Sequence, residues 1–382
     1  MNMCNLVSIS ERILLFTGSK NTMNLLHSYQ PIVTLPSASL DIIGDVHGEY
    51  EALSLLLHYL GYDSLGRHAA GRKLVFIGDL CDRGPDSPAV VRLVQGMANA
   101  GNAICVLGNH ELNILRGLRK DGNSWFWNET ADGDVKFGKM RVLPMAERQS
   151  VLDFFTNLPI VACNSQLRVV HAAWHTPSFN EIGSQALTSI VEYFDARERQ
   201  TNDVIHSDSR FQYYVAEQKQ WRVHISDEAQ AVPFLGATAY MRELRQMANP
   251  IRVLTSGVET ADSGTLFSGG EWRFVQRARW WDSYTEAVPV LIGHYWRNPQ
   301  DKPVSALSRG RDLFAGVAPY DWHGACGNVF CVDYCVGARF LERSGVMAQG
   351  QTRLAAMRWP ERTLMFDSGE QVATGNFGRL AG

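Results

Sequence analysis

The chain has 382 residues, 45% of them hydrophobic and 20% charged, which suits one large α/β domain with insertions or two domains of an ordinary globular protein. A net charge of −3 without a concentrated basic block argues against nonspecific nucleic-acid binding. No apolar stretch is long enough to span a bilayer, and the first 20 residues lack a secretion signal, so we expect no membrane insertion and no secretion.

The beginning of the chain and its cysteines bear on domain organisation and compartment. Residues 1–36 show no clear periodicity, so we expect a leader there and one domain over residues 37–382. Seven scattered cysteines, an odd number, favour a reducing compartment over a disulfide framework. We therefore expect a cytoplasmic protein.

The first strong signal is an apolar run over residues 40–43, which predicts a buried strand. Asp45 and His47 come just after it, in the segment Gly44-Asp-Val-His-Gly48. A chain that leaves a sheet can aim two such side chains into one crevice. Leucines at helical spacing then predict a helix over residues 49–60.

Two more strands with polar ends follow. Residues 73–77 lead into Gly78-Asp-Leu-Cys-Asp-Arg-Gly84, and residues 103–107 end in Gly108-Asn-His-Glu111. Between them, Ser87 and Pro88 are typical of a helix cap and first turn. Strands separated by helices imply right-handed crossovers and parallel pairing. The polar side chains would then emerge at one edge of the sheet: Asp45, His47, Asp79, Asn109 and His110.

The middle of the chain predicts a helix, a strand and an insertion. Residues 144–157 favour a helix in which Met145 is one of the buried positions, and residues 167–170 favour a strand that ends at His171. Residues 179–250 are polar and charge-rich. We interpret them as a partly helical insertion or cap, because a structureless loop of that length is improbable.

The last part of the chain predicts further strands. An apolar run over residues 288–292 ends at Gly293-His294, and residues 328–336 and 353–366 read as strands that complete a sheet. Cys331, Asp333 and Cys335 alternate along the first of these, which favours a packed face over a metal cluster.

Taken in order, the quoted segments, with His171 and Gly293-His294 after them, resemble the signature of the calcineurin-like metallophosphoesterases. Within these, the phosphoprotein phosphatase branch, which includes the bacterial diadenosine tetraphosphate hydrolases, is the most similar. The resemblance spans about residues 40–295. It implies an α/β fold of the metallophosphatase type: a β-sandwich of mixed sheets flanked by helices, here with the inserted polar segment.

The resemblance also implies two divalent metal ions. Asp45 and His47 would hold the first, Asn109, His171 and His294 the second, and Asp79 would bridge them. The ligand types agree, because carboxylate and amide oxygens mixed with imidazoles, without thiolates, suit Mn²⁺ best and also Fe or Zn²⁺. Two bridged metals can generate a hydroxide for in-line attack on phosphorus.

The remaining roles that the resemblance implies are catalytic. His110 would be the general acid, and Asp82 would orient its imidazole. Arg83 and Asn109 would bind phosphate. The run Arg277-Ala-Arg-Trp-Trp-Asp-Ser-Tyr284 is similar to an Arg-x-x-Trp-x-x-x-Tyr run of bacterial relatives, so Arg277 would be the second phosphate-binding arginine, with Arg279 as the alternative.

We therefore expect a hydrolase that acts on phosphate esters or anhydrides, with a nucleotide, a dinucleoside polyphosphate or a phosphoprotein as substrate. A serine/threonine phosphoprotein phosphatase and a noncatalytic binding module on the same fold are the alternatives. The segments His171-Ala-Ala-Trp-His175 and Gly293-His-Tyr-Trp-Arg297 depart from the usual family pattern near the pocket mouth, so they leave the substrate open. Tryptophans such as Trp296 could stack a nucleobase, although aromatic residues more often fill cores.

Overall fold

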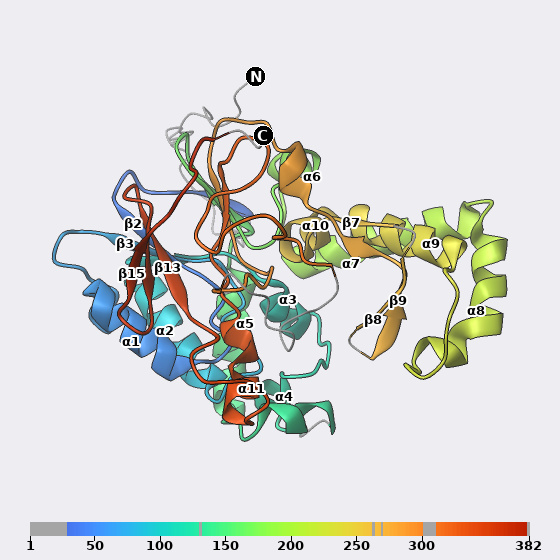
Figure 1. Cartoon of the computed structure of the whole chain (residues 1–382), viewed down its shortest axis with the longest axis horizontal. Helices are drawn as coiled ribbons and strands as arrows, with labels where there is room; N and C mark the ends of the chain where they lie inside the picture. The colour runs from blue at the N-terminus through green and yellow to red at the C-terminus, as the bar shows by residue number, and fades with distance from the viewer. Residues whose placement is uncertain (1–28, 130–131, 262–263, 269, 301–310, 380–382) are drawn as a thin grey trace, which may run out of the picture.

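The computed structural model describes residues 29–129, 132–261, 264–268, 270–300 and 311–379. Two β-sheets pack face to face, and helices cover their outer sides (Figure 1). This is the mixed α/β sandwich that the sequence predicts. A group of helices and short strands extends from one side of the sandwich (Figure 1).

The larger sheet carries the first strands of the expected signature. Its order is β15 (Gln371–Ala373), β14 (Thr363–Phe366), β13 (Ala355–Trp359), β2 (Leu40–Ile43), β3 (Lys73–Phe76) and β4 (Ala103–Cys105). The last three strands are parallel, as expected, with the crossover helices α1 (Tyr50–Leu60) and α2 (Ser87–Asn99) between them. β13 runs antiparallel to β2, so the sheet is mixed.

The smaller sheet supplies the remaining strand ends. Its order is β1 (Ile32–Thr34), β5 (Val161–Cys163), β6 (Arg168–Val170), β11 (Val290–Ile292) and β12 (Val329–Cys331). β1 pairs with β5 in parallel, so residues before 37 already belong to the sheet. The leader expected over residues 1–36 therefore extends too far. Residues 1–28 of that leader lie outside the described residues.

The core follows from the alternation of side chains along the strands. Ile42 and Val75 point between the sheets, where they pack with Leu291 and Phe330 in one buried cluster. Ile43 and its neighbours in β3 and β4 point the other way, against the apolar faces of α1 and α2. Both faces of the central strands are therefore buried, which explains their nearly unbroken apolar sequences.

Three local expectations are corrected. The cap of α2 is Asp86, whose carboxylate accepts a hydrogen bond from the amide of Ala89, while Ser87 is the first helical residue. Met145 lies in a 3₁₀ turn before α5 (Arg148–Thr156), off the buried face of that helix, and its side chain is 66% exposed. The strand predicted over residues 328–336 ends at Cys331.

The polar region after β6 is mostly helical. It contains α6 (Thr176–Gly183), α7 (Ile190–Ser207), α8 (Phe211–Ile225), α9 (Gly236–Met247) and α10 (Pro250–Ser256). Two short ribbons follow, one of β7 (Glu259–Thr260) with β10 (Gln276–Arg277) and one of β8 (Leu266–Ser268) with β9 (Glu271–Arg273). Within the described part of the chain, no helix is both long enough and apolar enough to cross a membrane.

Candidate metal centre

The expected ligands share one position in the fold, just past the ends of strands at one edge of the sheets. They follow β2 (Asp45 and His47), β3 (Asp79), β4 (Asn109 and His110), β6 (His171) and β11 (His294). Asn109 and His110 begin α3 (Asn109–Leu115). Because β2, β3 and β4 are parallel, and β6 and β11 are parallel, the carboxyl ends of these strands come together.

The backbone at this edge is strained. Five non-glycine residues have left-handed conformations with φ between 47° and 75°: His47, Asp79, Asp82, Arg83 and His294. This conformation costs an L-residue about 1–2 kcal/mol. Such strain persists where the surrounding structure fixes it, and it concentrates at functional sites.

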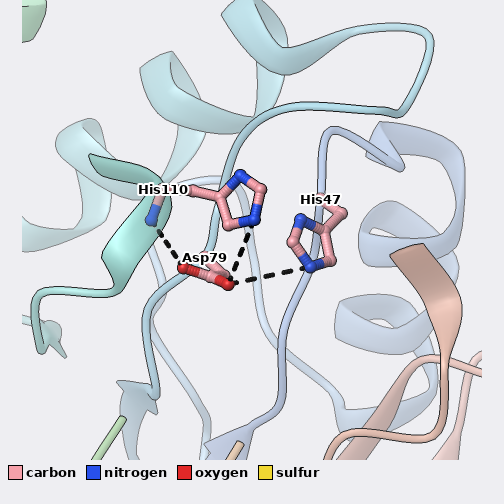
Figure 2. A group of neighbouring side chains, drawn as sticks. All are labelled: His47, Asp79 and His110. Carbon is pink, nitrogen blue, oxygen red and sulfur yellow. Dashed lines mark hydrogen bonds and ion pairs between the residues drawn. The ribbon is translucent and has the colours of Figure 1, made fainter. Parts of the chain in front are cut away.

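Asp79 lies at the middle of the group (Figure 2). Its Oδ2 atom is 3.8 Å from Nε2 of His47, 3.8 Å from Nε2 of His110 and 3.3 Å from Nε2 of His171. Its Oδ1 atom accepts a hydrogen bond of 3.0 Å from the backbone amide of His110 (Figure 2). The carboxylate belongs to two clusters of possible metal ligands, one with His47 and His110 and one with His171 and His294.

Second contacts orient two of the imidazoles. His47 Nδ1 lies 3.1 Å from the carbonyl oxygen of Cys81, and His171 Nδ1 lies 2.9 Å from that of Ile77. A carbonyl only accepts, so each Nδ1 donates, and in the neutral ring each Nε2 keeps a lone pair that could bind a metal ion. This is the usual way in which a protein fixes a metal-binding histidine.

Three buried ligand atoms have no hydrogen-bond partner among the described residues: Asn109 Oδ1, His171 Nε2 and His294 Nε2. Buried polar atoms without partners are rare because each costs free energy. All three are acceptors when the imidazoles are neutral, and they come from three different strand ends. A cation would satisfy them together, so the residues fit the metal that the fold implies.

The electrostatics agree with this fit. Burial lowers the pKa of His47 and His294 well below the usual range, so both rings are neutral and able to bind a metal. Burial also lowers the pKa of His171, but the carboxylates of Asp79 and Asp45 outweigh it and raise that pKa to about 10. A proton on His171 thus occupies a place that a metal ion would take, and metal binding should release it.

Glycines leave room for the ligands. A Cβ atom on Gly293 would overlap Oδ1 of Asp45, and one on Gly108 would overlap Oδ1 of Asp79. The His294 amide, which follows Gly293, donates to both oxygens of Asp45 at 3.1 Å. The glycines of the signature are therefore required by close approach to the carboxylates.

Replacing Gly293 with alanine is expected to displace Asp45 and to weaken Mn²⁺ binding by about 10- to 100-fold, the range for disturbing the support of a ligand. Titration calorimetry of metal-free protein measures this loss. Gly96, in α2, is the matched control, since a Cβ atom there meets no atom within 4 Å. Gly96→Ala should keep metal affinity and stabilise the fold by about 0.4–1 kcal/mol. Equal metal affinity in both variants would contradict this account of Gly293.

His110 and Asp82 form the expected pair. His110 Nδ1 is 2.5 Å from Oδ2 of Asp82, and both side chains are buried. The other carboxylate oxygen of Asp82 accepts a hydrogen bond of 2.6 Å from the indole N–H of Trp125 in α4 (Ser124–Trp127). Trp125 thus fixes the carboxylate of Asp82, which in turn orients His110. The sequence analysis did not predict this role of Trp125.

Arg83 lies over the same centre. Its guanidinium is 3.1 Å from Nε2 of His47 and 3.0 Å from Nε2 of His110. It also lies 5.6 Å from the ring of Trp296. A phosphate oxygen would be a stronger acceptor than either imidazole, so the arginine is positioned to exchange these contacts for contacts with an anion.

The two candidate arginines after β9 differ in their surroundings. Arg277, on β10, lines the same cavity as the expected ligands, and its charge contributes to the low pKa of His294. Arg279 forms an ion pair of 2.9 Å with Asp282 and donates to the carbonyl of Ala315. The geometry therefore favours Arg277 over Arg279. None of the described residues 179–250 lines this cavity, whereas the ribbons after them do.

Glu111 has a structural role beside the site. Its carboxylate accepts hydrogen bonds of 2.8–3.1 Å from the amides of Asp79, Leu80 and Gly108. It thereby ties the loop that carries Asp79 to the start of α3.

Asp333 is a buried carboxylate that the sequence analysis assigned to a packed face. It lies two residues past β12, as Asp45 lies two residues past β2, and it is 1% exposed. Its Oδ1 accepts from the amide of Cys335, and its Oδ2 has no partner among the described residues. Its charge helps to raise the pKa of Asp45, after the effect of burial. The position of an acid just past an apolar run was the signal available for it.

A sandwich of mixed sheets with carboxylates, histidines and an amide gathered at its strand ends defines a protein of the metallophosphoesterase class. A family model described as Calcineurin-like phosphoesterase matches residues 38–229, half of the chain, and the chain belongs to this family.

Three curated relatives have names that specify a substrate. Bis(5'-nucleosyl)-tetraphosphatase PrpE (asymmetrical) of Bacillus subtilis (strain 168) is 36% identical over 142 residues, 35% of this chain and 56% of that protein. The protein of the same name from Halalkalibacterium halodurans is 51% identical over 79 residues, 20% of this chain and 32% of that protein. A symmetrical bis(5'-nucleosyl)-tetraphosphatase of Dechloromonas aromatica (strain RCB) is 33% identical over 135 residues, 34% of this chain and 42% of that protein. The chain thus spans about a third to a half of the length of these relatives.

Among solved structures, a cold-active protein-tyrosine phosphatase of a psychrophilic Shewanella species is 14% identical. The comparison covers 94% of this chain and 86% of that one, with a TM-score of 0.46.

Proposed function

We propose that this protein is a metal-dependent hydrolase of phosphate esters or anhydrides that uses two divalent ions, with Mn²⁺ as the first choice. The observation that carries the proposal is the set of three buried, unpartnered acceptor atoms around Asp79. Mixed oxygen and imidazole donors suit Mn²⁺, and Fe or Zn²⁺ would also fit them. The seven cysteines, odd in number and scattered along the sequence, favour the reducing cytoplasm as its compartment.

The ligands divide into two sets that share one carboxylate. Asp45 and His47 would hold one ion, and Asn109, His171 and His294 would hold the other, with Asp79 common to both. Two such ions, when bound, lower the pKa of water and neutralise charge on the phosphoryl oxygens. The chain itself contributes the fixed spacing of the donors, because each is anchored to a strand end.

The other side chains would bind phosphate and move a proton. Arg83 can donate to two phosphoryl oxygens through its planar fork, and Arg277 and Asn109, which line the same cavity, would donate to phosphate as well. His110, held by Asp82, would protonate the leaving oxygen from Nε2. For this, Nε2 must be released from Arg83 and must take up a proton from solvent, and both become possible when a phosphate takes over the arginine contacts.

Dinucleoside polyphosphates are our first choice of substrate. The curated relatives are named for them, and the cavity has a volume of about 1270 Å³, which leaves space beyond a single phosphate. Nucleotides and phosphoproteins are the other substrates to be tested. A noncatalytic binding module is disfavoured, since such a module has no need of the His110–Asp82 pair or of Arg83.

Removal of metal is expected to abolish activity. In the proposed mechanism water activated by metal, and no side chain, attacks phosphorus, so exhaustive chelation should stop hydrolysis of p-nitrophenyl phosphate, and added Mn²⁺ should restore it. The readout is nitrophenolate release with metal content measured in parallel. Activity that persists in metal-free protein would contradict the proposal. A screen against dinucleoside polyphosphates, nucleotides and phosphopeptides then identifies the substrate.

A further inference from the structure

A buried arginine lies in the same cavity as the metal centre. Arg297 follows His294 by three residues, and its side chain is only 1% exposed. Both residues line the cavity, together with Phe314. Three residues span at most about 11 Å of extended chain, so the backbone of Arg297 is within that distance of the backbone of His294.

The guanidinium has only part of its hydrogen-bonding capacity satisfied. Nη2 donates to the carbonyl oxygens of Ala318, at 2.7 Å, and Asp321, at 2.5 Å. Nε and Nη1 have no partner, and no carboxylate forms an ion pair with Arg297 within the described ranges. A buried positive charge without an anion is energetically costly.

Aromatic rings cover the guanidinium but do not replace an acceptor. The rings of Phe330, Phe314 and Tyr334 lie 4.6 Å, 5.4 Å and 5.9 Å from its central carbon. Cation–π contacts satisfy the faces of the group. A ring face is a weaker acceptor than an oxygen atom, so Nε and Nη1 still require an acceptor.

A second buried donor lies beside the same ring. The indole of Trp281 stacks on Phe314, with ring centroids 5.5 Å apart and an angle of 10° between the planes. Its Nε1 is also buried and has no partner among the described residues. Two different side chains on Phe314 thus present unused N–H groups.

We propose that Arg297 is the base of a second binding site in the cavity, for an oxyanion of the phosphate class. Two sources of the anion share this chemistry. It could be a distal phosphate of a substrate whose scissile phosphate lies at the metal centre, or it could be free inorganic phosphate. The first source rests on the proposed function, whereas the binding site itself does not.

Phosphate binding at Arg297 can be measured in metal-free protein, so the test does not depend on catalytic activity. Chelated full-length protein is titrated with inorganic phosphate by calorimetry. We expect wild type to bind one phosphate at this site, and we expect an Arg83→Ala/Arg277→Ala double variant to bind it equally well. Arg297→Gln should weaken binding at least about tenfold, since a charged donor is lost. Arg353→Gln is the matched control, because Arg353 also lies over an aromatic ring but pairs with Glu370 away from the cavity.

Two further variants keep the test decisive. If Arg297→Gln does not fold, Arg297→Lys retains the charge but not the fork, and it should fold with weakened phosphate binding. Trp281→Phe should give a smaller loss if its N–H contributes. Absence of phosphate binding in chelated wild type, or loss of binding in the Arg83/Arg277 variant with retention in Arg297→Gln, overturns the proposal. An adventitious ion only, bound equally by all variants, would also overturn it.

Kinetics of the Mn²⁺-loaded protein separate the two sources. If a distal phosphate of the substrate is bound, Arg297→Lys should raise KM for a dinucleoside polyphosphate about tenfold and leave KM for p-nitrophenyl phosphate unchanged. If free phosphate is bound, neither KM should change, and inhibition by phosphate should weaken. Failure of the proposed function would appear as no hydrolysis by wild type, while phosphate binding to chelated protein would remain.

Discussion

Asp79→Asn is expected to lose both metal ions and nearly all turnover. Its carboxylate is the member common to both ligand clusters, with Oδ2 3.8 Å from His47 and 3.3 Å from His171. A neutral amide removes the charge that balances two cations, and it offers one oxygen where the carboxylate offers two. Loss of an outer-shell partner already costs about 10- to 100-fold in affinity, so the loss here should exceed that range. Metal analysis of dialysed protein and the rate with p-nitrophenyl phosphate measure it.

The fold should survive this substitution, which makes the result interpretable. The amide oxygen can still accept the hydrogen bond from the backbone of His110 that Oδ1 accepts. Asp153→Asn, an exposed position on α5, is the matched control and should keep full metal content and activity. If Asp79→Asn kept the metal content of the wild type, Asp79 could not be the ligand that both metal ions share.

His110→Asn is expected to keep both metals and to lose rate according to the leaving group. A general acid contributes about 10²- to 10⁴-fold when the leaving oxygen is basic. The loss should therefore approach that range for an alkyl phosphate and be much smaller for p-nitrophenyl phosphate, whose leaving group needs little protonation. The comparison of kcat for the two substrates measures it.

The support of His110 gives the control for this prediction. In Asp82→Asn the imidazole loses the partner that lies 2.5 Å from its Nδ1, while Trp125 can still donate to the remaining oxygen. We expect Asp82→Asn to lose less kcat than His110→Asn does, with the same dependence on the leaving group. Equal losses for both substrates in His110→Asn would exclude the acid role.

The parts of the site that sequence could predict are those encoded locally. Each expected ligand comes just after a short apolar run, and a parallel sheet brings such strand ends together whatever the rest of the chain does. The contacts of Asp82 and Arg83 with His110 were expected from the family resemblance, and the structure brings these side chains together. The periodicity of apolar residues also predicted the outer strands and the helical region, although some of the predicted boundaries were wrong.

The parts that could not be predicted depend on contacts between distant segments. Trp125 supports Asp82 from a separate helix, 43 residues away in the chain. Gly337 is close to the ring of His47, so that any Cβ atom there would overlap it, and nothing in its own neighbourhood of the sequence reveals this. Arg297 looks like an ordinary polar residue in sequence, and only the packing of three aromatic rings shows that it is buried. Strand β1 likewise could not be predicted from its own sequence, because it is a strand only through its pairing with the distant strand β5.

The pairing of β13 with β2 has a consequence for the order in which the chain can fold as it is made. Ile43 pairs with Ala356, so β2, which leads to Asp45, cannot pair on this edge until about 300 further residues have been synthesised. At a translation rate of about 5–20 residues per second, that wait is about 15–60 s. During this time one edge of β2 remains open, which is the situation in which nascent chains associate wrongly. A metal centre that includes His294 could therefore be completed only after that residue has left the ribosome.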